Sequence, residues 1–254
     1  MNIRDVLEKH RKGEIDASEA EKLLRLDYIE RIAGHTLFDV RRAERKGVPE
    51  IIYGESKSPD AIADIIEGVM AQRDILLVSR ASIDQFEAVR ARVPEARYEE
   101  KARMIVLDRR KVHEGTGLIG VLTAGSSDIS VAEEARVVAE AMGCRVLTAY
   151  DVGIATFHRF MEPLHLMLKE GADALIVVAG MEGALASVVS SLADVPVIGV
   201  PTSVGYGVGE GGRAALASML QSCSPGLVTV NIDNGVGAGI TAALISLRCR
   251  RSKQ

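Results

Sequence analysis

From residue 118 onward the sequence repeats one pattern, in which a short apolar run is followed by a segment of helical length. The apolar runs consist almost wholly of Val, Ile, Leu and Ala, so strands built from them must be buried on both faces, as in an all-parallel sheet. Five strand–helix units predict an open, doubly wound parallel sheet of three layers. The predicted strands cover residues 118–122, 146–149, 174–179, 197–200 and 227–232, and the helices after the last four cover 156–169, 183–192, 212–220 and 237–247.

Charge is spread unevenly along the chain. Residues 1–120 hold 45 of the 66 Asp, Glu, Lys and Arg side chains, whereas 16 of the 24 glycines lie in the remaining 134 residues. This difference predicts two domains, residues 1–114 and 115–254, divided near the charged stretch RRKVHEGTG. The helices predicted in the second domain carry few charges, so we expect other subunits of a homo-oligomer to cover them.

The first domain is expected to be smaller, with helices followed by a short α/β unit. Apolar residues recur at helical spacing near the N-terminus, and Ser18 is the expected cap of the second helix. The α/β unit comprises predicted strands at 51–54, 75–78 and 103–107 and helices that start at Ser58 and Ser82.

Composition excludes several classes of function. No run approaches the roughly 18 apolar residues of a membrane helix, and the charged N-terminus does not look like a signal segment, so we expect a cytoplasmic protein. A net charge of −4 without a basic stripe argues against nucleic acid as a partner. Three cysteines without short spacing fit neither a disulfide framework nor a zinc site.

Three glycine patterns invite comparison with nucleotide-binding loops. The first, at residues 115–120, runs into a strand and is set aside, because no helix N-terminus follows it. Gly207 and Gly209 lie between a strand and a helix, and they fit either a cofactor-binding turn or a mobile loop over the substrate. Gly235 and Gly237 open the last helix, where they suit either an anion or close packing.

The segment after the first strand of the second domain predicts a binding loop. Small residues let the backbone approach a ligand, hydroxyls donate hydrogen bonds, and a helix N-terminus favours phosphate. A plain helix cap is the alternative, but four such residues together exceed what a cap requires. The predicted binding residues are Gly125, Ser126, Ser127 and Asp128.

Further candidates follow the next strands. His158 and Arg159 come after a glycine turn, and they are either substrate contacts or ordinary surface residues. Glu182 follows the third strand, where open α/β sheets keep their sites, although an acid also suits the start of a helix. Cys223 follows a helix C-terminus and precedes a strand, so by itself it is expected to be structural and to face the wrong end of the sheet.

As a set, these residues resemble the N5-carboxyaminoimidazole ribonucleotide mutase family. The chain carries GSSD at 125–128, FHR at 157–159, AGMEG at 179–183 and PVIGVP at 196–201, in the same order as the matching mutase motifs. Phe157 replaces a small residue of that pattern, the phosphate loop is shifted, and Glu182 and Cys223 do not belong to it.

These departures fit a related family, LarB, the pyridinium-3,5-biscarboxylic acid mononucleotide synthases that start assembly of the nickel-pincer nucleotide. The resemblance covers nearly the whole chain. Besides the motifs above, it rests on FDVRRAERKGVPEIIYGESK at 38–57, VGYGVGEGG at 204–212 and CSPGLVTVNIDNGVGAG at 223–239.

The resemblance implies a flavodoxin-like catalytic domain that carboxylates nicotinic acid adenine dinucleotide with carbon dioxide and releases AMP. Mg²⁺ is implied for the hydrolytic step, and neither biotin nor ATP is needed. It also implies an octamer with sites between subunits, which would explain why Cys223 faces away from a site built by one subunit.

The resemblance assigns roles residue by residue. Cys223 is the implied nucleophile, and Glu182 handles a proton or orients a carboxylate, with His158 as the competitor. Ser126, Ser127 and Arg159 would hold phosphate or carboxylate, while Asp128 or Asp233 would bind metal or ribose. Two alternatives stay open: mutase chemistry on an aminoimidazole ribonucleotide, and a non-catalytic nucleotide-binding module.

Overall fold

The structure is a computed structural model, and it describes residues 3–24, 29–32, 36–39, 47–70, 73–110 and 117–251. The chain forms two compact units. One comprises Met1–Arg97 with Val106–Arg109, and the other comprises Tyr98–Ile105 with Arg110–Gln254. The predicted domain boundary after residue 114 lies outside the described residues and stays a prediction.

The second unit contains the predicted parallel sheet. Its strands pair in the order β11-β10-β9-β7-β8, and every adjacent pair is parallel. Read from β8, this is the flavodoxin-like order, in which the first strand lies between the second and the third. The strands are β7 (Leu118–Thr123), β8 (Arg145–Ala149), β9 (Ala174–Ala179), β10 (Val197–Pro201) and β11 (Leu227–Thr229).

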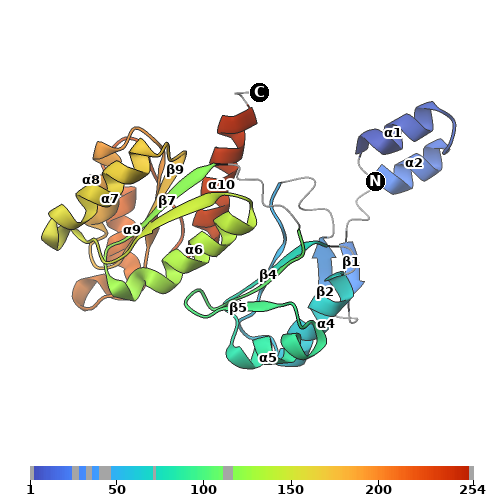
Figure 1. The fold of residues 1–254 in the computed structure, drawn as a ribbon, viewed down its shortest axis with the longest axis horizontal. Helices are drawn as coiled ribbons and strands as arrows, with labels where there is room; N and C mark the ends of the chain where they lie inside the picture. The colour runs from blue at the N-terminus through green and yellow to red at the C-terminus, as the bar shows by residue number, and fades with distance from the viewer. Residues whose placement is uncertain are drawn as a thin grey trace. The chain divides into compact units, whose positions relative to one another are not determined.

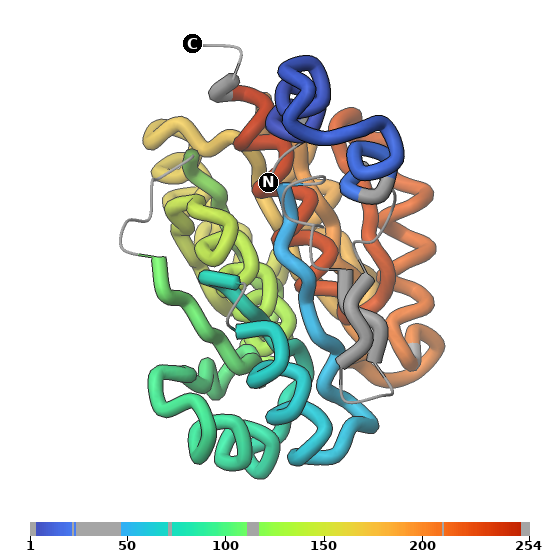
Figure 2. The backbone as a smooth tube through the Cα atoms, turned by 90° about the vertical axis from the view of Figure 1, so that its right-hand side faces the viewer, coloured from blue at the N-terminus to red at the C-terminus, as the bar shows by residue number. Residues whose placement is uncertain are grey.

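Helices cover both faces of this sheet (Figure 1). On one face α6 (Ile129–Ala141) packs against α10 (Gly235–Arg251). On the other face, α7 (His158–Lys169), α8 (Ala184–Leu192) and α9 (Arg213–Leu220) contribute Phe160, Leu185 and Met219 to one hydrophobic cluster with the strands. The three-layer, doubly wound architecture is thereby confirmed. Figure 2 follows the same alternation along the backbone from β7, in green, to α10, in red.

Some predicted boundaries were wrong. Strand β11 ends at Thr229 rather than at residue 232, because the chain turns there and Asp233, with φ +55°, donates its N–H to the Pro201 carbonyl. A 3₁₀ turn, η2 (Ile154–Thr156), precedes α7. Helix α10 continues to Arg251 rather than ending at residue 247 as predicted, and Cys249 is part of it.

The first unit begins with two short helices, α1 (Ile3–Arg11) and α2 (Ala17–Leu24), which bury Val6 and Ala20. Asp16, and not Ser18 as predicted, caps α2, because its carboxylate accepts the N–H of Glu19 at 2.7 Å. An antiparallel hairpin of β1 (Ile29–Ile32) and β2 (Thr36–Asp39) was not predicted, since its strands have four residues each and are half polar.

The small α/β unit of the first domain is confirmed in its main elements. Four strands pair in the order β3-β4-β6-β5, and Ser82 forms the predicted cap of α5 as a capping box with Gln85. No helix among the described residues is long and apolar enough to cross a membrane. The elements are β3 (Ile51–Tyr53), α4 (Pro59–Met70), β4 (Ile75–Ser79), α5 (Ile83–Arg92), β5 (Arg97–Glu99) and β6 (Met104–Asp108).

Candidate active site

A cavity of about 570 Å³ lies where the carboxyl ends of the five parallel strands meet, an edge called here the carboxyl edge. Its walls come from the segments that follow four strands: residues 124–128 after β7, 153–155 after β8, 179–185 around the end of β9, and 204–206 after β10. Ligands of open α/β sheets bind at this edge, close to the point where the strand order reverses. The position of the cavity therefore marks a candidate active site.

Small and apolar residues dominate the cavity walls. Polar side chains enter the lining at Ser127, Asp128, Glu182 and Tyr206, and none of the described residues that line the cavity is basic. Glycine is required at Gly180, where a Cβ atom would lie 2.4 Å from the Val204 carbonyl oxygen. The hydroxyls and backbone N–H groups in these walls can donate hydrogen bonds to an anionic group.

Asp128 is buried at the base of the cavity, with 3% of its surface exposed. Its Oδ2 atom accepts the N–H of Gly125 at 2.9 Å, and its Oδ1 atom accepts the hydroxyl of Thr202 at 2.7 Å. Burial raises the pKa of Asp128 although hydrogen bonds from Thr202, Gly125 and Gly180 oppose the rise. The carboxyl group thus contacts segments that follow three different strands.

Asp233 supports the same region from the segment after β11. Its Oδ1 atom accepts the N–H of Ser203 at 2.8 Å, and its own N–H donates to the Pro201 carbonyl at 2.9 Å. Asp233 and Asp128 repel each other enough to raise the pKa of Asp128 further. Asp233 does not line the cavity, but it holds the residues that lead into the wall at 204–206.

His158 and Arg159 follow β8 at the carboxyl edge, at the start of α7. Both side chains are exposed, and neither lines the cavity. Arg159 forms an exposed ion pair with Asp151, in which Nη1 lies 3.3 Å from Oδ2. Asp151 has φ +57°, and its N–H donates to the Thr123 hydroxyl at 2.9 Å, which ties this turn to the end of β7.

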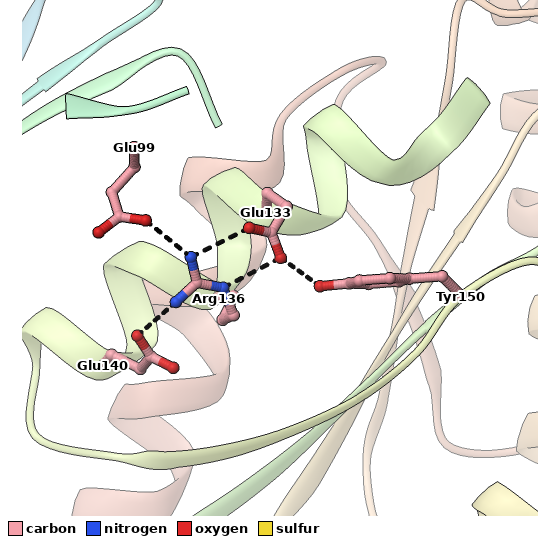
Figure 3. A network of polar contacts seen from close by, with 5 residues as sticks. All are labelled: Glu99, Glu133, Arg136, Glu140 and Tyr150. Atoms are coloured by element: carbon pink, nitrogen blue, oxygen red, sulfur yellow. Dashed lines mark hydrogen bonds and ion pairs between the residues drawn. The ribbon is translucent and has the colours of Figure 1, made fainter. Parts of the chain in front are cut away.

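A polar cluster around Arg136 supports the same turn from the α6 side (Figure 3). Nε and Nη2 of Arg136 each lie 3.0 Å from a carboxylate oxygen of Glu133, and the guanidinium also contacts Glu99 and Glu140. The hydroxyl of Tyr150, the residue before Asp151, donates to Glu133.

Burial and the bond to Glu133 raise the pKa of Tyr150 to about 12. Burial also raises the pKa of Glu140, whereas at Glu133 the hydrogen bonds from Arg136 and Tyr150 outweigh burial and lower the pKa. The two glutamates differ because Glu133 receives several hydrogen bonds and Glu140 receives one from Arg136. Tyr150 and Arg136 thereby stabilise the chain that enters the cavity wall at 153–155.

Glu182 is exposed and lines the cavity at the end of β9, in the segment just before α8. Its neighbours Met181 and Gly183 have φ of +51° and +67°, so the chain turns sharply at this position. The turn directs residues 180–182 along the cavity wall. The prediction that Glu182 lies at the carboxyl edge is confirmed, whereas its chemical role stays a prediction.

Cys223 lies at the opposite edge of the sheet, because it precedes β11 and β11 runs parallel to the other strands. Its side chain is exposed. Two serines of α8 hold the loop: the Ser224 hydroxyl donates to the Ser187 carbonyl at 2.8 Å, and the Ser190 hydroxyl donates to the Pro225 carbonyl at 2.9 Å. The expectation that Cys223 faces away from a site within one subunit is confirmed.

Four of the glycines predicted as ligand contacts, Gly207, Gly209, Gly235 and Gly237, lie outside the cavity lining. Gly207 and Gly209 belong to a 3₁₀ segment, η3 (Gly207–Gly212), rather than to a tight turn between strand and helix. A Cβ atom at Gly235 would lie 2.1 Å from the Val131 carbonyl, so this glycine allows α10 to pack closely on α6. The N–H of Gly237 donates to the Asn234 side chain at 2.8 Å, which makes Asn234 a cap of α10.

The AIR carboxylase family matches residues 118–252, more than half of the chain. The chain belongs to the AIR carboxylase family. A second family, described as the LarB/PurE-like N-terminal domain, matches residues 30–110. This AIR carboxylase family member therefore carries a LarB-type domain ahead of its flavodoxin-like domain, as the sequence motifs indicate.

Individual relatives support both halves of this description. The uncharacterized protein MJ0165 of Methanocaldococcus jannaschii is 41% identical over 251 residues, which cover 96% of this chain and 97% of that protein. The N5-carboxyaminoimidazole ribonucleotide mutase of the same organism is 32% identical over 126 residues, or 49% of this chain and 76% of the mutase. The mutase of Thermotoga maritima is 31% identical over 134 residues, or 50% of this chain and 73% of the mutase.

Mg²⁺ was expected for this AIR carboxylase family member, with Asp128 or Asp233 as ligands. Both side chains accept hydrogen bonds from the protein, and no three His, Cys, Asp or Glu side chains within the described part of the chain converge as metal ligands. Mg²⁺ keeps few protein ligands and demands near-octahedral oxygen geometry. Binding of Mg²⁺ at Asp128 or Asp233 therefore stays a prediction.

The predicted residues that the cavity brings together are Gly125, Ser127, Asp128 and Glu182, while Ser126 lies beside them outside the lining. Sequence reasoning missed Thr202, Tyr206 and Tyr150. Thr202 directly follows a buried strand, β10. A position after a strand is also what identified Glu182, so the same reasoning could have identified Thr202. Tyr150 also directly follows a strand, β8, but its bond to Glu133, 17 residues away, cannot be predicted from that position.

Proposed function

We propose that this protein carboxylates the pyridinium ring of nicotinic acid adenine dinucleotide and hydrolyses the phosphoanhydride, giving pyridinium-3,5-biscarboxylic acid mononucleotide and AMP. The observation that carries the proposal is the combination of a LarB-type N-terminal domain with an AIR carboxylase domain in one chain. The mutases that match this chain cover about half of it, whereas MJ0165 shares nearly its whole length.

The reaction divides one difficult step into easier ones. The Cys223 thiolate adds to ring carbon 4, and the ring loses its positive charge and becomes an enamine. The enamine electrons then move from carbon 5 to carbon dioxide and form a carbon–carbon bond. A base removes the proton from carbon 5, the carbon–sulfur bond breaks, and the aromatic pyridinium is restored with the thiolate regenerated. No net oxidation or reduction occurs.

Residues of this chain take the remaining roles in the proposal. Glu182, in the cavity wall, accepts the carbon 5 proton, with His158 as the alternative. Ser126 and Ser127, together with Arg159, bind phosphate or carboxylate groups. Water attacks the phosphoanhydride in the hydrolytic step and releases AMP, and Mg²⁺ would lower the charge on the phosphates when bound with them.

A single subunit does not bring Cys223 to the carboxyl edge, so the proposal includes a homo-oligomer in which Cys223 of one subunit meets the cavity of another. Large apolar side chains are exposed near both edges of the sheet, among them Phe157, Met161, Leu192, Leu220 and Val228. Burial of such side chains between subunits would stabilise the assembly.

The direct test is an incubation of the purified protein with nicotinic acid adenine dinucleotide, bicarbonate and Mg²⁺. We expect AMP and a doubly carboxylated mononucleotide by mass spectrometry. Cys223→Ser should lower the rate by about a thousandfold or more. The control is Cys249→Ser, which changes a half-buried cysteine of α10. Equal activity of wild type and Cys223→Ser would rule out the covalent mechanism.

Mutase chemistry is the second candidate, because relatives named as N5-carboxyaminoimidazole ribonucleotide mutases match about half of the chain. The same protein preparation, offered N5-carboxyaminoimidazole ribonucleotide, would then form the carbon-linked carboxylate. Activity on this substrate together with no reaction of the dinucleotide would replace the first proposal by the second.

A further inference from the structure

Residues 202–206 lead from the end of β10 into the cavity wall, and two carboxylates hold their beginning. Thr202 is fully buried and donates its hydroxyl to Asp128 at 2.7 Å. The next residue, Ser203, donates its N–H to Asp233 at 2.8 Å. Asp128 and Asp233 come from different loops, so two successive residues are fixed from two directions.

Beyond this anchor the side chains become exposed. Val204 is 41% exposed and Tyr206 is 79% exposed, and both line the cavity. Tyr206 lies between Gly205 and Gly207, which have φ of +147° and +72°. Such values favour glycine and few other residues. The position of Tyr206 on the cavity therefore depends on how firmly residues 202 and 203 are held.

Asp128 has little capacity left for a ligand of its own. Each of its carboxylate oxygens already accepts a hydrogen bond from the protein, and its exposed fraction is 3%. A carboxylate offers about four acceptor positions, and hydrogen bonds from Thr202, Gly125 and Gly180 occupy three of them. The burial of the side chain leaves little room for a ribose hydroxyl or a metal ion at the remaining position. The contacts of Asp128 thus differ from those expected of a residue that binds substrate.

We propose that Asp128 is a positioning residue that acts through Thr202 to hold residues 204–206 against the cavity, and that it does not bind substrate itself. The inference rests on the proposed function only for the choice of nicotinic acid adenine dinucleotide as the probe. Thr202→Val then removes the hydroxyl bond, and Asp128→Asn weakens it and also replaces a carboxylate oxygen that accepts a backbone N–H. The effects that both variants exert on residues 203–206 through the shared bond should therefore not add.

The test is a double-mutant cycle with Asp128→Asn, Thr202→Val and the double variant. Binding of nicotinic acid adenine dinucleotide is measured by calorimetry without bicarbonate, and hydrogen exchange of amides 203–206 is measured without any ligand. Each single variant should raise Kd about tenfold and speed the exchange of amides 203–206. The double variant should have a Kd no higher than that of the single variant that binds less tightly. Thr202→Ser, which keeps the hydroxyl, should restore wild-type values.

A matched pair at the other edge of the sheet controls for loss of a buried carboxylate. Asp173, just before β9, accepts the Ser246 hydroxyl at 2.7 Å and the Leu118 N–H at 3.3 Å. Asp173→Asn and Ser246→Ala should leave Kd and the exchange of amides 203–206 at wild-type values, whatever they do to Tm.

The outcomes separate the inference from the proposed function. If Asp128→Asn weakens binding while Thr202→Val changes neither readout, or if the two effects multiply, Asp128 binds substrate directly and the inference is overturned. Wild-type exchange at 203–206 in Asp128→Asn would overturn it as well. If wild type does not bind or convert the dinucleotide but the exchange data show the coupling, the proposed function fails and the positioning role stands.

Discussion

Glu182 and Cys223 lie at opposite ends of helix α8. Glu182 is in the segment just before the first residue of the helix, whereas the loop of Cys223 is bonded to Ser187 near its middle and to Ser190 in its last turn. A helix of nine residues spans about 13 Å. The two side chains therefore cannot act on one pyridinium ring within a single subunit.

This relationship predicts complementation between subunits. Glu182→Gln and Cys223→Ala homo-oligomers should each be inactive, but subunits mixed from the two after partial denaturation should regain up to about a quarter of wild-type activity, because some sites pair two intact residues. The measurement is formation of the doubly carboxylated mononucleotide by the mixture. A mixture that exchanges subunits by mass spectrometry yet stays inactive would show that both residues act from one chain.

The order of elements in the second unit could be predicted from sequence because its strands are short apolar runs and segments of helical length follow them. Strands β7, β8, β9 and β10 end within one residue of expectation. The carboxyl-edge position of Gly125, Asp128 and Glu182 follows from that order alone, since each directly follows a strand. The local sequence pattern is therefore enough to place a residue whose position is set by the strand that precedes it.

Contacts between distant segments could not be predicted in this way. Thr202 and Asp128 are 74 residues apart, and only strand order brings their loops together across β9. Asp128 was therefore predicted to bind a ligand, because its hydrogen bond with Thr202 could not be predicted from the local sequence. The hairpin of β1 and β2 was not predicted for another reason. Its strands are short and contain charged residues, so they form by pairing with each other and show no apolar pattern in the sequence.

Gly180→Ala tests how closely the cavity wall approaches β9. The added methyl group would lie 2.4 Å from the Val204 carbonyl oxygen and 2.8 Å from the Thr202 hydroxyl oxygen. Because the carbonyl is backbone, residues 202–204 must move, and the free energy of unfolding should fall by about 1–3 kcal/mol. Urea unfolding measures the loss.

The comparison variant for Gly180→Ala is Gly125→Ala. A Cβ atom at Gly125 would have its nearest neighbour at 3.5 Å, an ordinary contact, and φ there is −123°. Its free energy of unfolding should stay within about 0.5 kcal/mol of wild type. Equal stability of the two variants would contradict the close approach at Gly180.

Tyr150→Phe tests the polar cluster around Arg136. Burial and the bond to Glu133 raise the pKa of Tyr150 from 10.0 to about 12. A group whose pKa is higher in the folded state stabilises the protein fully below its unfolded pKa and loses that contribution as the pH rises through the folded value. The stability difference between wild type and Tyr150→Phe should therefore shrink from pH 10 to about pH 12. A difference that does not change with pH across this window would show that the hydroxyl is not bonded to Glu133.

Asp128→Asn should change the pH dependence of stability at the acidic end. Burial raises the pKa of Asp128 above 3.8, so the folded protein binds this proton more tightly than the unfolded chain does. Between the pKa of Asp128 in the unfolded chain and its higher pKa in the folded protein, wild type loses stability as the pH rises, because only the unfolded chain ionises freely there. The neutral amide lacks this loss, so the stability of Asp128→Asn relative to wild type should increase as the pH rises from 3.8 towards the raised pKa of Asp128. Urea unfolding at several pH values, with Asp173→Asn as control, measures the slope. Parallel curves for wild type and Asp128→Asn would mean that Asp128 keeps its ordinary pKa in the folded protein, whereas a positive slope would show that the chain retains a buried carboxylate at a cost in stability.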